Sequence, residues 1–283
     1  MNTKYRDLIE QTFYFPQEEF KLEDSELQFH GIDLMALVEK YGAPLKFTYL
    51  PKISENINRA KEWFKNAIEE HDYKGKYNYC YCTKSSHFEH VLNEALSNDI
   101  HIETSSAFDI NIVQKLKKTG KLSKDAYVIC NGFKRDQYIS NIADLLNDGH
   151  KNCIPIIDNY EEIDLLSEKI NDPYKIGIRI ASEEEPKFEF YTSRLGIGYK
   201  NIVPFYNKKI KDNPDVELKM LHFFINTGIR DTAYYWNELN KCLKVTSILK
   251  RYVRVWIALI LEVDSQLKIL LLLNMTTNIW YRK

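Results

Sequence analysis

The chain has 283 residues, enough for one large domain or two small ones. Its 39 basic and 40 acidic side chains nearly cancel to a net charge of −1, which gives no electrostatic reason to expect nucleic acid or an anionic membrane as a partner. No two of the five cysteines form a Cys-x-x-Cys pair, so zinc binding and redox chemistry are disfavoured, and we expect no metal site. The cysteine pattern and an N-terminus without an apolar signal segment favour a cytoplasmic location.

Residues 1–40 differ from the rest of the chain. The segment FYFP (13–16) and the run around LQFHGI (27–32) resemble short strands. We therefore expect residues 1–40 to contribute to a second, β-rich domain.

Residues 41–245 alternate short β-rich runs with amphipathic stretches. The predicted strands are LKFTYL (45–50), KYNYCYCTK (76–84), IHIETSS (100–106), AYVICNG (126–132), NCIPIID (152–158), KIGIRIA (175–181) and LKMLHFFI (218–225). Between them, apolar residues such as Ile53, Ile57, Ala60, Phe64 and Ala67 recur at helical spacing. The pairs Ser86/Glu89, Ser106/Asp109 and Asn159/Glu162 predict helix starts, and Gly120 and Gly149 predict helix ends.

This repeat predicts a parallel sheet covered by helices, either a barrel or an open doubly wound sheet. No G-x-G-x-x-G follows the first strand, which argues against a dinucleotide-binding fold. A barrel carries its chemistry at the carboxyl ends of its strands. That rule selects Lys84, Glu103, Ser105, Asn131, Arg179, His222 and Thr227.

Lys84 ends a run whose side chains alternate between two faces. Asn78, Cys80, Cys82 and Lys84 share the face with the smaller side chains, which suits a crowded barrel interior. An amine held at the barrel mouth and partly desolvated can attack an aldehyde. Spacing alone favours a solvated lysine at a strand end.

Several segments resemble ornithine, diaminopimelate and biosynthetic arginine decarboxylases, which use pyridoxal 5′-phosphate (PLP) and have an alanine-racemase-like barrel. In order along residues 27–245 they are KYGAPLKFTYLPKISENI, YCYCTKSSHFEHVLNEA, IHIETSSAFDINIV, VICNGFKRDQYI, KIGIRIA with SRLGI, and LKMLHFFINTGI. The fourth is most similar to arginine decarboxylases. Each motif is weak, and their common order makes the resemblance specific.

The resemblance implies a PLP-binding (β/α)8 barrel over residues 41–245, incomplete in this chain. It implies that Lys84 forms the covalent link to the aldehyde of PLP, and that Glu103 is the acidic residue near it. Arg179 would order the site, and Thr227 would stand where a serine binds the cofactor phosphate. Phe224 replaces a histidine that stacks on the pyridine ring.

His222 aligns with the first histidine of its segment, or is simply a hydrogen-bonded core residue. An alternative for Asn131 and Cys130 is that they only pack at the end of a strand. Asn226 replaces a family glycine, so the turn beside it can differ.

The implied reaction is decarboxylation of a basic amino acid, with arginine to agmatine in polyamine biosynthesis favoured and diaminopimelate as the alternative. The family also implies a homodimer. A non-catalytic PLP-binding barrel and an inactive fragment are further alternatives.

Residues 246–283 change character, with no Gly, Pro, Phe or His and six basic against two acidic side chains. The segment WIALILEVDSQLKILLLL is interrupted by charges, so it lacks the ~18 uninterrupted apolar residues of a membrane span, and an amphipathic terminal helix is the simplest prediction.

Read from the third base of each codon, residues 256–270 permit DSLNIGGGFPIKNS, an apolar strand followed by the glycine-rich loop that the family places next. The Asp is forced by the Trp and Ile codons, whereas the glycines are only permitted. We therefore expect a frameshift near residue 246, an out-of-frame tail over 246–283, and a chain that binds PLP weakly at best and lacks decarboxylase activity.

Overall fold

The computed structural model describes residues 19–23, 26–182, 195–224, 232–252 and 258–262. Contacts divide the chain into a unit of residues 1–49 and a unit of residues 50–283.

The first unit contains a three-stranded antiparallel sheet and one helix. Strands β1 (Phe20–Glu23), β2 (Glu26–Phe29) and β3 (Ile32–Asp33) pair in chain order, and α2 (Leu34–Tyr41) follows. The carboxylate of Asp33 caps this helix by accepting from the main-chain N–H groups of Met35 and Ala36. The strand prediction around residues 27–32 is confirmed, while residues 13–16 lie outside the described residues.

The strand predicted over residues 45–50 is wrong, because residues 45–49 have no strand structure. The rings of Phe47 and Tyr49 both lie with their centroids 5.5 Å from that of Phe29. Their alternating apolar pattern therefore reflects packing around Phe29. A strand also needs a pairing partner, which alternation alone does not supply.

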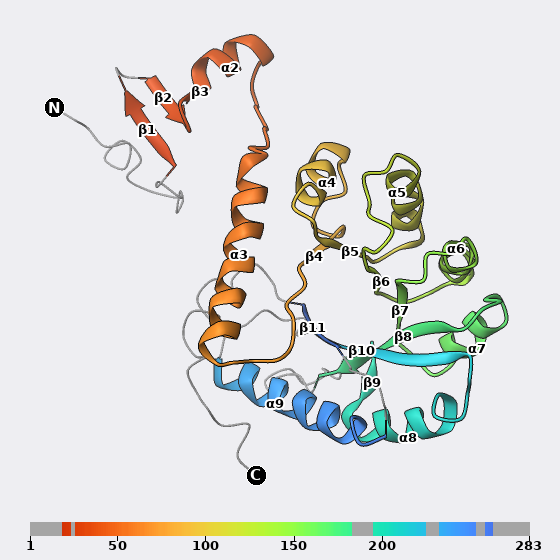
Figure 1. The fold of residues 1–283 in the computed structure, drawn as a ribbon. Coiled ribbons are helices and arrows are strands. Elements are labelled where there is room, and N and C mark those ends of the chain that lie inside the picture. The colour runs from red at the N-terminus through yellow and green to blue at the C-terminus, as the bar shows by residue number, and fades with distance from the viewer. Residues whose placement is uncertain (1–18, 24–25, 183–194, 225–231, 253–257, 263–283) are drawn as a thin grey trace, which may run out of the picture. The chain divides into compact units, whose positions relative to one another are not determined.

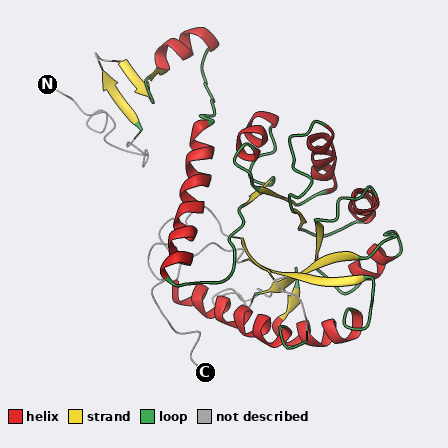
Figure 2. Ribbon diagram, in the orientation of Figure 1, coloured by secondary structure: helices red, strands yellow, loops and turns green. Residues whose placement is uncertain are grey.

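The second unit is a curved, parallel eight-stranded sheet with helices outside it (Figures 1 and 2). Its strands are β4 (Cys80–Cys82), β5 (His101–Thr104), β6 (Val128–Cys130), β7 (Cys153–Ile157), β8 (Tyr174–Ala181), β9 (Ile197–Gly198), β10 (Val216–Phe224) and β11 (Ala258–Glu262). Its helices are α3 (Pro51–Glu70), α4 (Glu89–Leu96), α5 (Ala107–Lys118), α6 (Asp136–Asn147), α7 (Glu162–Ser167), α8 (Tyr199–Lys209) and α9 (Thr232–Leu249).

The strand order is β11-β10-β8-β7-β6-β5-β4, with β9 paired to β8. The six other predicted runs all contain strands of this sheet. The order ends at β4 and β11 in the described part of the chain, so the barrel is partial, as predicted. Strand β10 carries one register shift against β8, between Leu218 and Met220.

Both faces of the sheet are buried, which explains its nearly continuous apolar strands. Val128 and Cys130 pack outward in the main core, between the sheet and the helices. Ile129, between them, points the other way and joins Ile154, Ile156 and Met220 in a separate inner cluster. Successive side chains of this strand therefore pack alternately into the outer and the inner hydrophobic cluster.

The predicted helix boundaries are partly right. The Ser86/Glu89 cap is wrong: Phe88 is the N-cap of α4 and makes no side-chain cap bond. Ser106 is the N-cap of α5, although Asp109 accepts instead from the main-chain N–H of Ser105 at 2.9 Å. The Asn159 side chain accepts from the N–H groups of Glu161 and Glu162 before α7. Gly120 and Gly149 follow α5 and α6 with positive φ angles, as helix ends favour.

The tail differs from the simplest prediction. Residues 258–262 form strand β11, which pairs with β10 in parallel from Met220 opposite Ala258. The terminal-helix prediction is therefore wrong for these residues, because the open edge of β10 supplies a pairing partner for a short, mainly apolar run.

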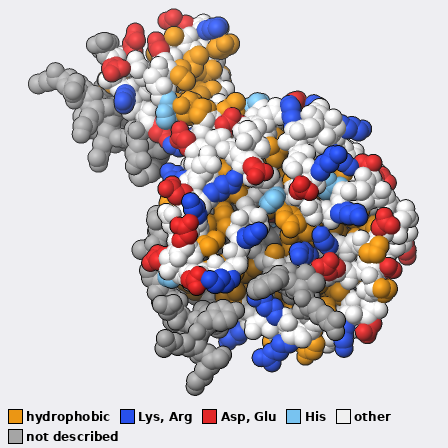
Figure 3. Space-filling model, in the orientation of Figure 1, with side chains coloured by type: hydrophobic (Ala, Val, Ile, Leu, Met, Phe, Trp, Pro, Cys, Tyr) orange, Lys and Arg blue, Asp and Glu red, His pale blue; other side chains and the backbone are white. Residues whose placement is uncertain are grey.

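Figure 3 shows acidic and basic side chains interspersed over the visible face of the second unit. No helix within the described ranges is both long and apolar enough to cross a bilayer.

Candidate functional site

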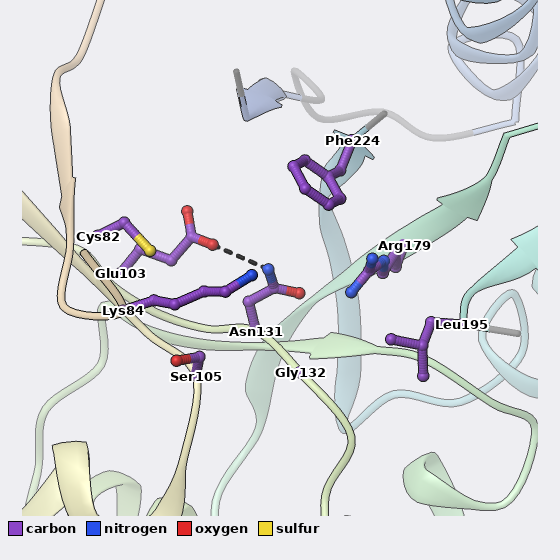
Figure 4. Close-up of a pocket in the computed structure, with 9 residues that line it drawn as sticks. All are labelled: Cys82, Lys84, Glu103, Ser105, Asn131, Gly132, Arg179, Leu195 and Phe224. Carbon is purple, nitrogen blue, oxygen red and sulfur yellow. Dashed lines mark hydrogen bonds between the residues drawn. The ribbon is translucent and has the colours of Figure 1, made fainter. Parts of the chain in front are cut away.

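A cavity of about 290 Å³ opens at the carboxyl ends of the parallel strands (Figure 4). Strands β4, β5, β6, β8 and β10 each bring side chains to it, because parallel strands all end at the same edge. The lining residues are Cys82, Lys84, Glu103, Ser105, Asn131, Gly132, Arg179, Leu195 and Phe224.

Lys84 lies just beyond β4. The strand sends Tyr81 outward, where its hydroxyl donates to the Ser86 carbonyl at 3.1 Å. Cys82 and Lys84 point to the opposite side and line the cavity, which confirms the predicted faces. The Lys84 side chain is exposed at the mouth of the cavity.

Glu103 is a buried carboxylate on the neighbouring strand, directly opposite Cys82 in register. Its Oε1 accepts a hydrogen bond of 2.9 Å from the Asn131 amide. The same oxygen lies 3.5 Å from His222 Nε2, which forms an ion pair if the imidazole is protonated. Burial, with the nearby charge of Glu103 as a second cause, raises the pKa of the Cys80 thiol to about 12.

Arg179 approaches from β8 on the other side of the cavity. Its Nε lies 3.7 Å from the carboxylate of Asp158, which is almost fully buried and receives no hydrogen bond from the described residues. The guanidinium also lies 5.5 Å from the ring centroid of Phe224, and Lys84 Nζ lies 5.7 Å from the same centroid. One aromatic ring is thus within reach of both cations.

Most of the predicted residues meet at this cavity. Lys84, Glu103, Arg179 and Phe224 line it, and His222 is fully buried beside Glu103 without lining the cavity. Thr227 and Asn226 lie outside the described residues. The role of Asp158 was missed, although its place after a strand was a usable signal. The strand-end rule selected Asn131, yet gave no sign of its bond to Glu103.

The fold and the cavity define an α/β-barrel protein with a primary amine at the mouth of a cavity. A family model, described as the pyridoxal-binding domain of pyridoxal-dependent decarboxylases, matches residues 52–258. The chain therefore belongs to this family, whose cofactor is PLP.

Two curated relatives are biosynthetic arginine decarboxylases. One, arginine decarboxylase 2 from Synechocystis sp., is 26% identical over 228 residues, covering 72% of this chain and 34% of the relative. The one from Rhodopirellula baltica is 24% identical over 218 residues, covering 70% and 31%. The chain thus spans about a third of the length of these relatives.

Solved structures show the same fold at lower identity. Diaminopimelate decarboxylase from M. jannaschii in complex with L-lysine has a TM-score of 0.70 at 20% identity, covering 86% of this chain and 56% of that one. The biosynthetic arginine decarboxylase from Campylobacter jejuni has a TM-score of 0.61 at 17% identity, covering 83% and 40%.

The residues present fit PLP. Lys84 offers the primary amine that an aldehyde requires, and Phe224 offers an aromatic face within reach of it. Arg179 places a positive charge in the cavity, which suits an anionic cofactor. At about 290 Å³ the cavity is close to the lower end of the range for small-molecule sites, roughly 300–1,000 Å³.

Proposed function

We propose that Lys84 binds PLP in this cavity and that the protein decarboxylates a basic amino acid, with arginine as the favoured substrate. The observation that supports this proposal most directly is that the Lys84 amine lies at the mouth of a cavity, which the buried carboxylate of Glu103 also lines. When bound, PLP supplies the electron withdrawal that lets the bond to the α-carboxylate break.

The chain's own residues have separate tasks in this proposal. Lys84 must lose a proton before it attacks an aldehyde, and Glu103 can accept that proton. Arg179 holds negative charge on the opposite side of the cavity. Phe224 stacks on the ligand ring and keeps water from that face, but it cannot titrate as a histidine does. His222 supports Glu103 from the interior, and Thr227 is proposed to bind the phosphate.

Arginine is favoured by the resemblance of residues 128–139 and by the curated relatives. Diaminopimelate is the second candidate, because structural similarity to its decarboxylases is just as strong. Asn131 and Gly132 are the residues of segment 128–139 that line the cavity, whereas Lys134 is buried beside Glu162. Any influence of this segment on substrate choice therefore acts mainly through two positions.

Other parts of the proposal extend beyond this domain. We propose a cytoplasmic location, a role in polyamine biosynthesis and a homodimer for the full-length family member. If residues 246–283 are out of frame, as proposed, we expect the 283-residue chain itself to bind PLP weakly and to release no CO2.

The direct test is chemical trapping. The chain is incubated with PLP, reduced with borohydride, digested and analysed by mass spectrometry. We expect a pyridoxyl group on Lys84, which Lys84→Met abolishes and the control Lys115→Met, at an exposed position of helix α5, leaves intact. An adduct spread over surface lysines, with none on Lys84, would overturn the proposal. A Lys84 adduct without amine production in a full-length family member would favour the non-catalytic PLP-binding barrel.

A further inference from the structure

Asn131 occupies a position that can set the geometry of the acidic group in the cavity. It follows β6 directly, lines the cavity, and is only 5% exposed. Its side-chain amide donates to Glu103 Oε1 at 2.9 Å, across from the neighbouring strand (Figure 4). A hydrogen bond to a buried carboxylate is stronger and more directional than one between neutral groups.

The main chain of Asn131 is fixed on both sides. Its N–H donates to the Thr104 carbonyl at 2.9 Å, and its own carbonyl accepts from the Tyr138 hydroxyl at 3.0 Å. That hydroxyl also lies 3.0 Å from Thr104 Oγ1, so helix α6 ties together the ends of β5 and β6. Asn131 is therefore held in place independently of its side chain.

Gly132, the next residue, further restricts the position of the backbone beside Asn131. Gly132 has a φ of 84°, and a Cβ built on it would lie 2.9 Å from the Ser105 carbonyl oxygen. The two loops thus touch through their backbones at a point where only glycine fits. The backbone of Asn131 is thus fixed, and the next residue is held against Ser105. The side-chain amide of Asn131 is directed at Glu103.

Both contacts of the Glu103 carboxylate fall on one oxygen. Asn131 and His222 meet Oε1, and Figure 4 shows the other oxygen directed away from Asn131. These two contacts therefore hold the Glu103 carboxylate by Oε1 in the cavity that Lys84 also lines.

We infer that Asn131 is a positioning residue, which fixes the Glu103 carboxylate within the cavity so that this group can take the proton of Lys84 when the aldehyde of PLP is captured. This inference rests on the proposed function of Lys84. Asn131 thereby takes part in cofactor capture, through its hydrogen bond to Glu103. Its position in the sequence alone was equally compatible with packing at the strand end.

The test compares two near-isosteric variants with a matched control. Asn131→Leu removes the donor without adding charge, and Asn131→Asp replaces the donor by a second carboxylate. Asn141→Asp is the control, because Asn141 is also buried, and its amide donates to the Ala107 carbonyl from α6, away from the cavity. For each variant the PLP dissociation constant, the yield of pyridoxyl-Lys84 and the urea unfolding curve are measured.

We expect both Asn131 variants to weaken PLP binding by about tenfold, the loss of one hydrogen bond to a charged group. Asn131→Asp should also change the pH profile of PLP capture, because two adjacent carboxylates share a proton and one of them titrates above its usual range. The other ionisable groups that face Glu103 or share its cavity are Lys84, Arg179, His222, Cys80 and Cys82, and they are the same in the unaltered chain and in Asn131→Asp. Asn141→Asp should leave both the affinity and the profile unchanged.

The possible failures are distinguishable. If the unaltered chain yields no pyridoxyl-Lys84, the proposed function and this inference both fall. If it yields the adduct while the two Asn131 variants keep its affinity and pH profile, only this inference falls. Loss of affinity with an unchanged pH profile in Asn131→Asp would indicate a packing role and likewise overturn the inference.

Discussion

Lys134 and Glu162 form an ion pair that is sealed from solvent, with side chains 0% and 1% exposed and a closest N–O distance of 3.3 Å. Lys134 Nζ also donates to the carbonyls of Gly132 and Ile156, at the ends of β6 and β7. The Glu162 carboxylate accepts from the main-chain N–H groups of Lys134 and Asp158. The pair therefore joins the adjacent loops that follow β6 and β7.

Lys134→Met should lower the free energy of unfolding by about 3–5 kcal/mol, because it leaves a buried carboxylate without its counter-charge. Urea denaturation measures this change. Lys134→Met combined with Glu162→Gln should lose less than the single variant, since no uncompensated charge remains. A single variant within about 1 kcal/mol of the unaltered chain would show that the pair is not structurally important.

Phe224→Ala should weaken PLP binding about two- to tenfold, the usual contribution of one aromatic contact. Phe224→Tyr should retain the affinity, because it preserves the ring that lies near Lys84 and Arg179. Phe108→Ala, at an 80% exposed position in α5, is the control for losing a phenyl ring. Absorbance titration with PLP gives the dissociation constants, and equal values for Phe224→Ala and the control would contradict the stacking role.

Cys82 should be the first thiol to react with iodoacetamide at pH 8, since it lines the cavity. Burial raises the pKa of both Cys80 and Cys242 to about 12, so only about one thiol in ten thousand is ionised at either position. PLP should protect Cys82, and all five cysteines should react in urea. Peptide mapping shows which thiol is labelled, and a Cys82 rate that PLP does not change would place the ligand elsewhere.

Stability should fall as the pH drops below about 6.5, partly because of His150. This side chain is 3% exposed, and burial lowers its pKa while its Nε2 lies 3.0 Å from the Ala126 carbonyl. The unfolded chain then binds more protons than the folded one below the unfolded pKa, so acid favours unfolding. His150→Gln should lose less stability between pH 7 and pH 5 in urea titrations, and parallel curves for the two proteins would rule His150 out.

The tail prediction is tested on DNA. Nucleotide sequencing across codons 240–260 and onward should reveal a second reading frame that encodes an apolar strand followed by a glycine-rich loop. A coding sequence in which that frame is interrupted, or lacks the glycines, would eliminate the frameshift hypothesis.

The fold could be predicted because strands buried on both faces leave strong apolar runs between amphipathic stretches. The lengths of the strands could not be predicted in the same way. The run 76–84 forms a strand over Cys80–Cys82 alone, since those are the residues that His101–Glu103 pair with. Strand β11 was not predicted, because an apolar segment interrupted by charged residues is as compatible with a helix as with a strand. Only the free edge of β10, which is a feature of the folded sheet, decides between the two.

The site was predictable to the extent that it depends on single strands. Alternation and the strand-end rule were enough to place Lys84 and Glu103 at one cavity. The bond from Asn131 to Glu103 and the approach of Asp158 to Arg179 depend on which side chains meet across neighbouring strands. That information resides in tertiary structure, and no local pattern encodes it.

The backbone contact between Gly132 and Ser105 has a consequence for redesign of the cavity. Because the two loops meet without an intervening side chain, moving one to admit a bulkier substrate would push the other. Substitutions meant to enlarge the cavity are therefore better placed at Leu195, where trimming a side chain makes room without displacing main chain.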